Sequence, residues 1–123
     1  MRAAVLALVA AAACCGAAAS AQSVRMVLQS SRLAGFGHGE AATVFPELRV
    51  GDALALAREP DNRHDPNAVR VEWRGHKLGY VPRAENVALA WAMDRGETLS
   101  ARVTRLRRHP NPRMRIEFDV YME

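Results

Sequence analysis

A single loop contains the residue types in this sequence that are best suited to hold a polar ligand. Residues 58–69 read REPDNRHDPNAV, in which two prolines and two asparagines are mixed with charged residues. Asn and Asp side chains bond nearby backbone groups and can hold such a loop rigid. Two interpretations stay open: an ordered connector between two strands, or a binding loop, since rigid polar loops are where ligands are often bound.

Catalytic and metal-binding signals are weak. The four histidines, at positions 38, 64, 76 and 109, are scattered, and no His-Glu-x-x-His or comparable ligand spacing occurs. His38, His64 and Asp65 could form a metal or acid–base cluster only if the fold brings them together. We therefore expect no cofactor and no enzymatic activity, and keep a small metal-assisted hydrolase as an alternative.

Arginines form a second group of residues that could bind a ligand. The chain has 17 Lys and Arg against 13 Asp and Glu, and the segment between Glu97 and Glu117 contains arginines but no acid. These are Arg102, Arg105, Arg107, Arg108, Arg113 and Arg115. Clustered guanidinium groups bind phosphates through forked donors and counterion release. The alternatives are a phosphate or anion patch, which would also suit an anionic membrane surface or acidic polysaccharide, and a solvated hairpin tip.

The first 21 residues differ in composition from the rest. Arg2 precedes an unbroken apolar run over residues 3–15, Gly16 ends the run, and residues 19–21 read ASA, a small-x-small cleavage pattern. A membrane-spanning helix needs roughly 20 apolar residues, so this run is too short to span. The pattern predicts a secretory signal peptide over residues 1–21, cleaved near Ala21/Gln22, and therefore a periplasmic or secreted protein.

Both cysteines, Cys14 and Cys15, lie inside this segment. A lipoprotein anchored at Cys14 is the alternative, although Ala11 stands where a large aliphatic residue is usual. Cleavage after Ala21 leaves one domain, residues 22–123, without cysteine. That excludes a disulfide scaffold, a thiol nucleophile and a thiolate zinc site, so the hydrophobic core alone must hold the domain together.

Alternating apolar residues predict a mainly β domain. Strands are expected over residues 24–28, 53–57, 68–73, 77–81, 99–103 and 114–120, with residues 33–36 continuing the first strand or pairing nearby. Residues 74–76 and 111–112 predict the turns of two hairpins. Short strands with frequent turns favour a small closed or half-closed β-barrel.

One helix is expected between the two hairpins. Pro82 suits the first helical position, and Gly96 lies just past the expected end. Four apolar residues recur between them at helical spacing, and we expect this stripe to face the core: Ala84, Val87, Ala88 and Trp91.

The loop and the hairpin that follows it resemble the HIRAN domain. The matching stretches are the loop at 58–69, GHKLGYVPR at 75–83, LAGF at 33–36 and DRGE at 94–97. The resemblance extends over roughly residues 25–106. It implies a six-stranded OB-like or SH3-like barrel with two flanking helices, and a non-catalytic binding module. In eukaryotic fork-remodelling helicases such a module captures the 3′ end of single-stranded DNA.

The resemblance also implies a ligand site. Its residues in this sequence would be Phe36, His38, Asn62, His64, Asp65 and Tyr80, with Asp65 accepting a hydrogen bond from a terminal 3′-hydroxyl. The DNA-binding members have a tyrosine in place of His64, and an arginine and a tyrosine in place of Gly37 and His38. The implied partner is single-stranded nucleic acid, through a 3′ end or its phosphates. An exported module that binds a protein or envelope component is the alternative. We expect a monomer without a membrane span.

Overall fold

The computed structural model of the chain describes residues 25–123, and the predicted signal peptide, with Cys14 and Cys15, lies outside the described residues. The strands are β1 (Met26–Arg32), β2 (Ala53–Glu59), β3 (Ala68–Trp73), β4 (His76–Tyr80), β5 (Leu99–Leu106) and β6 (Ile116–Met122). The α-helices are α1 (Ala41–Val44) and α2 (Val87–Asp94). Four 3-10 turns complete the described part: η1 (Phe36–His38), η2 (Phe45–Glu47), η3 (Arg83–Glu85) and η4 (Pro112–Met114).

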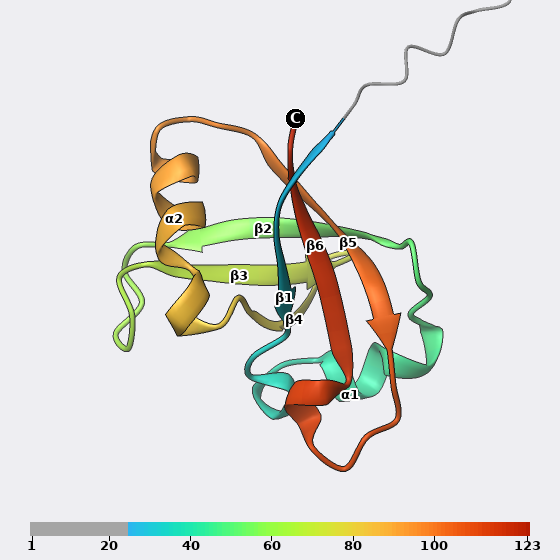
Figure 1. The fold of residues 1–123 in the computed structure, drawn as a ribbon. Helices are drawn as coiled ribbons and strands as arrows, with labels where there is room; N and C mark the ends of the chain where they lie inside the picture. The colour runs from blue at the N-terminus through green and yellow to red at the C-terminus, as the bar shows by residue number, and fades with distance from the viewer. Residues whose placement is uncertain (1–24) are drawn as a thin grey trace, which may run out of the picture.

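The six strands form one antiparallel sheet in the order β1-β6-β5-β2-β3-β4. Strand β2 joins its two halves, because Ala53 and Leu54 pair with β5 whereas residues 55–59 pair with β3. Figure 1 shows β2 and β3 crossing β1, β5 and β6 steeply, so that the sheet folds over its own inner face. The core lies in that fold, and the prediction of a mainly β, six-stranded, barrel-like domain is confirmed.

The alternation read from the sequence matches the burial of the strands. On β3 the inward side chains are Val69, Val71 and Trp73, and on β6 they are Ile116, Phe118 and Val120, all buried. Strands β5 and β6 form the predicted C-terminal hairpin. Strands β3 and β4 form the other, with a two-residue turn at positions 74 and 75. Both turn residues have positive φ, as the tight turns of hairpins require.

The two edges of the sheet meet at one residue pair. Ala34, just after β1, and Tyr80, at the end of β4, exchange two backbone hydrogen bonds of 2.9 Å each. The approach depends on Gly79, because a Cβ there would overlap the carbonyl oxygen of Ala34. Residues 33–36 therefore do pair nearby, as one of the two predictions for them stated, and they close one corner of the sheet.

The helix prediction was partly wrong. Pro82 precedes the short turn η3, and α2 begins only after the buried Asn86. The residues that face the core are Leu89, Ala90 and Ala92, whereas the expected stripe lies outward, with Trp91 59% exposed. Asn86 is the reason: its amide bonds to the loop between β2 and β3, and the positions three and four residues further along the helix then share its inward face.

The end of the helix was predicted correctly. Gly96 has a φ of 86°, and its N–H bonds to the carbonyl of Met93 while that of Glu97 bonds to Ala92. This pair of bonds is the usual way in which a glycine terminates a helix. Within residues 25–123, no helix has the length and apolar character needed to cross a membrane.

Candidate functional site

A groove of about 530 Å³ opens at the corner where the segment after β1 meets β4, and we call it the corner groove. It is formed by three segments that are far apart in sequence: residues 34–38, residues 62–68 and residues 77–83. Its lining residues are Ala34, Gly35, His38, Asn62, His64, Asp65, Ala68, Lys77, Tyr80, Val81 and Arg83. Of the six ligand residues implied by the resemblance, only Phe36 is not in this groove.

The loop between β2 and β3 is held in place by its own side chains. The Asn62 Oδ1 atom accepts hydrogen bonds from the backbone N–H groups of His64, at 2.9 Å, and Asp65, at 3.2 Å. Asp65 Oδ1 accepts from the N–H of Asn67 at 2.9 Å. These are the local bonds expected of Asn and Asp in turns. The loop is thus an ordered connector that also presents side chains to the groove.

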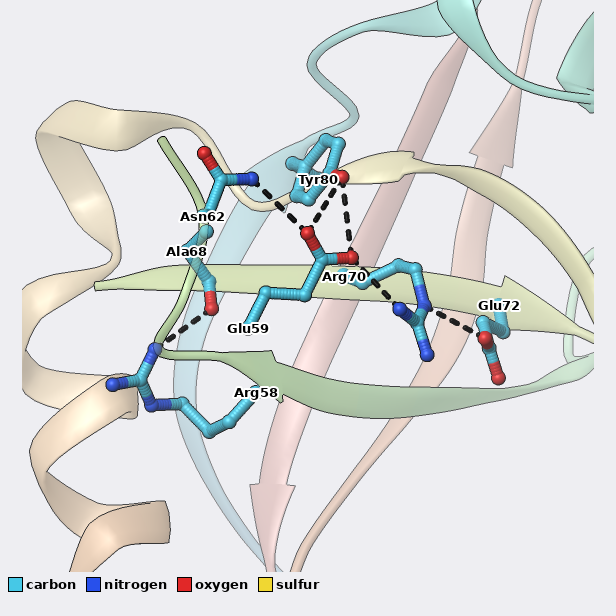
Figure 2. Close-up of polar contacts among 7 residues, drawn as sticks. All are labelled: Arg58, Glu59, Asn62, Ala68, Arg70, Glu72 and Tyr80. Atoms are coloured by element: carbon cyan, nitrogen blue, oxygen red, sulfur yellow. Dashed lines mark hydrogen bonds and ion pairs between the residues drawn. The ribbon is translucent and has the colours of Figure 1, made fainter. Parts of the chain in front are cut away.

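Arg58 fastens the same loop to helix α2. Its guanidinium donates to the carbonyls of Ala68, at 2.8 Å, and Pro66, at 3.0 Å. Figure 2 shows the bond to Ala68. Two further bonds, of 2.9 and 3.1 Å, reach both carboxylate oxygens of Asp94, and these bonds lower the pKa of that carboxyl. Planar guanidinium suits this bidentate contact, which a lysine could not reproduce.

Glu59 supports the corner groove from below, and Figure 2 shows its four polar contacts. Its carboxylate accepts from the Asn62 amide at 3.0 Å, from the Tyr80 hydroxyl at 2.9 and 3.2 Å, and from Arg70 at 2.8 Å. Arg70 in turn pairs with Glu72 at 2.7 Å. Burial alone would raise the pKa of Glu59, but the hydrogen bonds outweigh it, so the pKa is lowered. An ionised Glu59 therefore orients two groove residues from different segments.

Asp65 is a half-buried carboxylate facing the groove. Its Oδ2 atom accepts from the Asn86 amide at 2.6 Å, in addition to the Asn67 contact on Oδ1. Burial alone would raise the pKa of Asp65. These hydrogen bonds and the charges of Arg83 and Arg58 lower it by more than burial raises it, so the pKa falls below its ordinary 3.8. Because each ionised oxygen accepts more than one hydrogen bond, Asp65 retains capacity for a donor on a ligand.

Two cations share the groove with Asp65. The Lys77 ammonium lies 4.6 Å from the centre of the Tyr80 ring, and Arg83 lies at the opposite end of the same segment. Neither forms an ion pair with another described residue. Among residues 25–123, Asp65 is the only carboxylate that lines the groove, so the positive charges of the described lining outnumber the negative ones. The sequence pattern did not single out either cation, although both belong to the stretch at 75–83.

Phe36 lies on the far side of η1 from the groove and is buried. It forms the floor of a second hollow, also about 530 Å³, which we call the arginine pocket. Apolar side chains form its walls and two arginines its rim; the lining residues are Phe36, Ala42, Phe45, Pro46, Arg108, His109, Pro110 and Arg115.

The six C-terminal arginines do not gather at one site. Arg108 and Arg115 share the arginine pocket, Arg113 lines a different depression, and Arg102 and Arg105 project from β5. Arg107, half-buried, lines none of these hollows. Of the described residues, no acidic side chain pairs with any of the six.

The histidines are divided between separate places as well. His38 and His64 line the corner groove, whereas His76 contacts Glu40 at 3.2 Å and His109 accepts the N–H of Asn111 at 3.0 Å. Residues 25–123 contain no group of three or more His, Cys, Asp or Glu that could hold a metal ion. The candidate cluster of His38, His64 and Asp65 thus borders one groove without forming a ligand set.

These features define a small, barrel-like β domain with an ordered polar groove at its sheet corner, which is the build of a binding module. The family model for the HIRAN domain matches residues 28–123, and the chain belongs to that family. HIRAN domains are nucleic-acid-binding modules.

Known proteins with similar sequence or structure agree with this assignment. The chain is 40% identical over 53 residues to the Fanconi-associated nuclease 1 homolog of Oryza sativa subsp. japonica; the match covers 40% of the chain but 6% of that protein. A crystal structure of a protein from Lactobacillus plantarum superposes with a TM-score of 0.70 at 31% identity, over 80% of this chain and 94% of the other. The HIRAN domain of human HLTF gives 0.62 at 20% identity, over 76% and 73%, and supports the fold alone.

Proposed function

We propose that this protein is a non-catalytic module that binds single-stranded DNA in the corner groove, with a free 3′ end as the preferred ligand. One observation carries the proposal: an ionised carboxylate with spare acceptor capacity, Asp65, shares a groove with Lys77 and Arg83, two cations that pair with no other residue of the described part of the chain. A strand end offers the matching groups, a hydroxyl donor beside phosphates.

Asp65 would distinguish a strand end from a continuing strand. A terminal 3′-hydroxyl can donate to the carboxylate, whereas a 3′-phosphate places negative charge against it. Hydrogen bonds to charged groups contribute about 1.5–3 kcal/mol, so the preference for the hydroxyl should be about tenfold or more.

Lys77 and Arg83 would bind the phosphates next to that end. The ring of Tyr80 lines the groove beside Lys77, and its orientation is set because Glu59 holds the hydroxyl. Asn62 has a different role. Its amide oxygen accepts from the backbone of the loop and its amide nitrogen donates to Glu59, so it positions its neighbours rather than contacting the ligand.

Fluorescence polarisation with labelled single-stranded oligonucleotides tests the proposal. Oligonucleotides with a 3′-hydroxyl or a 3′-phosphate are compared over a salt series. Two phosphate contacts predict that the logarithm of the association constant falls with the logarithm of the salt concentration at a slope of about −1.4. Replacement of Arg83 by Ser should make this slope less negative by about 0.7.

Asp65→Asn and Asp61→Asn form a matched pair of variants. Both remove one negative charge from the same loop, but Asp61 is exposed and does not line the groove. We expect the preference for a 3′-hydroxyl to disappear in the first variant and persist in the second. Absence of binding at low salt, or a wild-type protein indifferent to the 3′ group, would contradict end recognition.

A further inference from the structure

The 3-10 turn η1 contributes residues to both the arginine pocket and the corner groove, and the chemistry of the two hollows is different. The 3-10 turn η1 packs against β4 on one side and against η4 on the other. His38 of this turn lines the corner groove, and Phe36, two residues earlier, lines the arginine pocket. Side chains two residues apart on a 3-10 helix point in different directions, so the two hollows lie on different sides of this one turn.

The floor of the pocket is aromatic. The rings of Phe36 and Phe45 meet edge to face, with centroids 5.9 Å apart and an interplanar angle of 72°. Phe36 is buried, but Phe45 is only partly covered, and the exposed side chains of Pro46 and Pro110 extend the apolar wall. A base of any sequence can stack on an exposed aromatic side chain, so the uncovered part of Phe45, with the two prolines beside it, is the surface that could accept one.

The rim of the pocket is positively charged. The Arg115 guanidinium stands 4.8 Å from the centre of the Phe36 ring, and its Nε donates to the carbonyl of His109 at 2.7 Å. That bond leaves the terminal amino groups of Arg115 without a partner among the described residues. Arg108 is exposed and equally unpaired within residues 25–123. The described residues that line the pocket include no carboxylate that could neutralise the two charges.

We propose that the arginine pocket binds a second nucleotide of the same strand, on the 5′ side of the end held in the corner groove. The inference rests on the proposed function for the direction of the strand. The base would lie against Phe45 and its proline neighbours, and its phosphate would bind Arg108 and Arg115. A free phosphate would use only the rim and leave the apolar floor exposed, whereas a nucleotide matches both.

An oligonucleotide length series tests this inference. Affinity is measured by fluorescence polarisation for 3′-hydroxyl strands of about two to about twelve nucleotides. We expect a step of about tenfold once a strand is long enough to reach the pocket. Arg108→Ser should remove the step and leave the shortest strands unaffected. Arg105→Ser is the matched control, because Arg105 is an exposed arginine of the same hairpin that lines neither hollow.

A second variant separates stacking from charge. Phe45→Leu keeps an apolar side chain in the packing and removes the ring. In the wild type, an abasic nucleotide at the position of the step should cost several-fold in affinity, and in Phe45→Leu that difference should vanish. Thermal unfolding of each variant verifies that the fold is retained.

The outcomes distinguish failure of this inference from failure of end recognition. Equal effects of Arg108→Ser and Arg105→Ser, or an unchanged step in both, would overturn the pocket as a nucleotide site. If 3′-phosphate strands bind with dependence on Arg108 but not on Asp65, the pocket stands and end recognition fails. Binding of phosphatidylglycerol vesicles through Arg108, with no oligonucleotide binding, would overturn the inference in favour of a membrane surface.

Discussion

Replacement of Gly79 by alanine tests how the corner groove is built. Gly79 lies in β4 where the segment after β1 closes on it, next to the pair formed by Ala34 and Tyr80. A Cβ at position 79 would overlap the Ala34 carbonyl oxygen and stand 3.2 Å from the Leu33 side chain. The main obstacle is backbone rather than a flexible side chain, so the two segments must separate.

The cost of separation can be estimated from what is lost. Two backbone hydrogen bonds of 2.9 Å join Ala34 to Tyr80, and each contributes about 0.5–1.5 kcal/mol net. Overpacking against the Leu33 side chain adds about 1–3 kcal/mol. The free energy of unfolding should therefore fall by about 2–6 kcal/mol, a large part of the 5–15 kcal/mol typical of a domain. Gly35 and Tyr80 would also move apart, so oligonucleotide binding should weaken even where the protein stays folded.

Urea unfolding followed by tryptophan fluorescence measures the effect. With a urea dependence of about 1–3 kcal/mol per molar, the midpoint should fall by about 1–3 M. Gly37→Ala is the matched control: it borders the same corner, its Cβ would meet nothing within 4 Å, and its φ is not positive. That variant should differ from the wild type by less than about 1 kcal/mol, in the stabilising direction. A Gly79→Ala protein as stable as Gly37→Ala would refute the account of the corner.

Three further predictions follow from other parts of the molecule. Glu59→Gln should lower the free energy of unfolding at neutral pH. Because the folded-state pKa of Glu59 lies below its ordinary 4.5, the loss relative to wild type should reach its full size above pH 4.5 and shrink as the pH falls below it. Urea unfolding at a series of pH values measures this difference. Leu89→Ala should cost about 2–5 kcal/mol and Trp91→Ser less than about 0.5, and equal losses in chemical unfolding would mean that the helix faces the other way. Residues 1–25 fused to a reporter should direct it out of the cytoplasm, and retention of the fusion in the cytoplasmic fraction would disprove the predicted signal peptide.

The sequence was sufficient to predict the strands because each has one buried face. Alternation along residues 68–73 and 116–120 has period two, and the turns between strands contain residues that tolerate positive φ. The helix shows the limit of this reasoning. Its apolar residues lie on more than one face, so spacing alone could not choose between the stripe through Trp91 and the one through Leu89. The choice depends on Asn86, whose partner lies 21 residues earlier in the chain.

In the corner groove too, features local in sequence could be predicted, whereas contacts between distant segments could not. Asn62, His64 and Asp65 could be proposed from sequence because they lie together in one short, unusual loop. The supporting pair of Glu59 and Arg70 could not, because its contacts cross strands β2 and β3 and depend on their register. Lys77 and Arg83 look like ordinary surface charges until the corner closes beside them. Local chemistry was therefore predictable, and the electrostatics that strand pairing creates was not.

The residues at positions 37, 38 and 64 determine how the proposed binding energy is divided between the corner groove and the arginine pocket. With Gly37, His38 and His64 in place of larger groups, the described lining of the corner groove has one Phe, Tyr or Trp ring, that of Tyr80, and Lys77 lies over it. The arginine pocket has two such rings, Phe36 and Phe45, with Arg115 over the Phe36 ring and Arg108 also in the lining. Recognition of the strand end should therefore depend on Asp65, and stacking of bases on Phe45. Sensitivity to the 3′ group and sensitivity to a missing base should then be lost in different variants, which one common site could not produce.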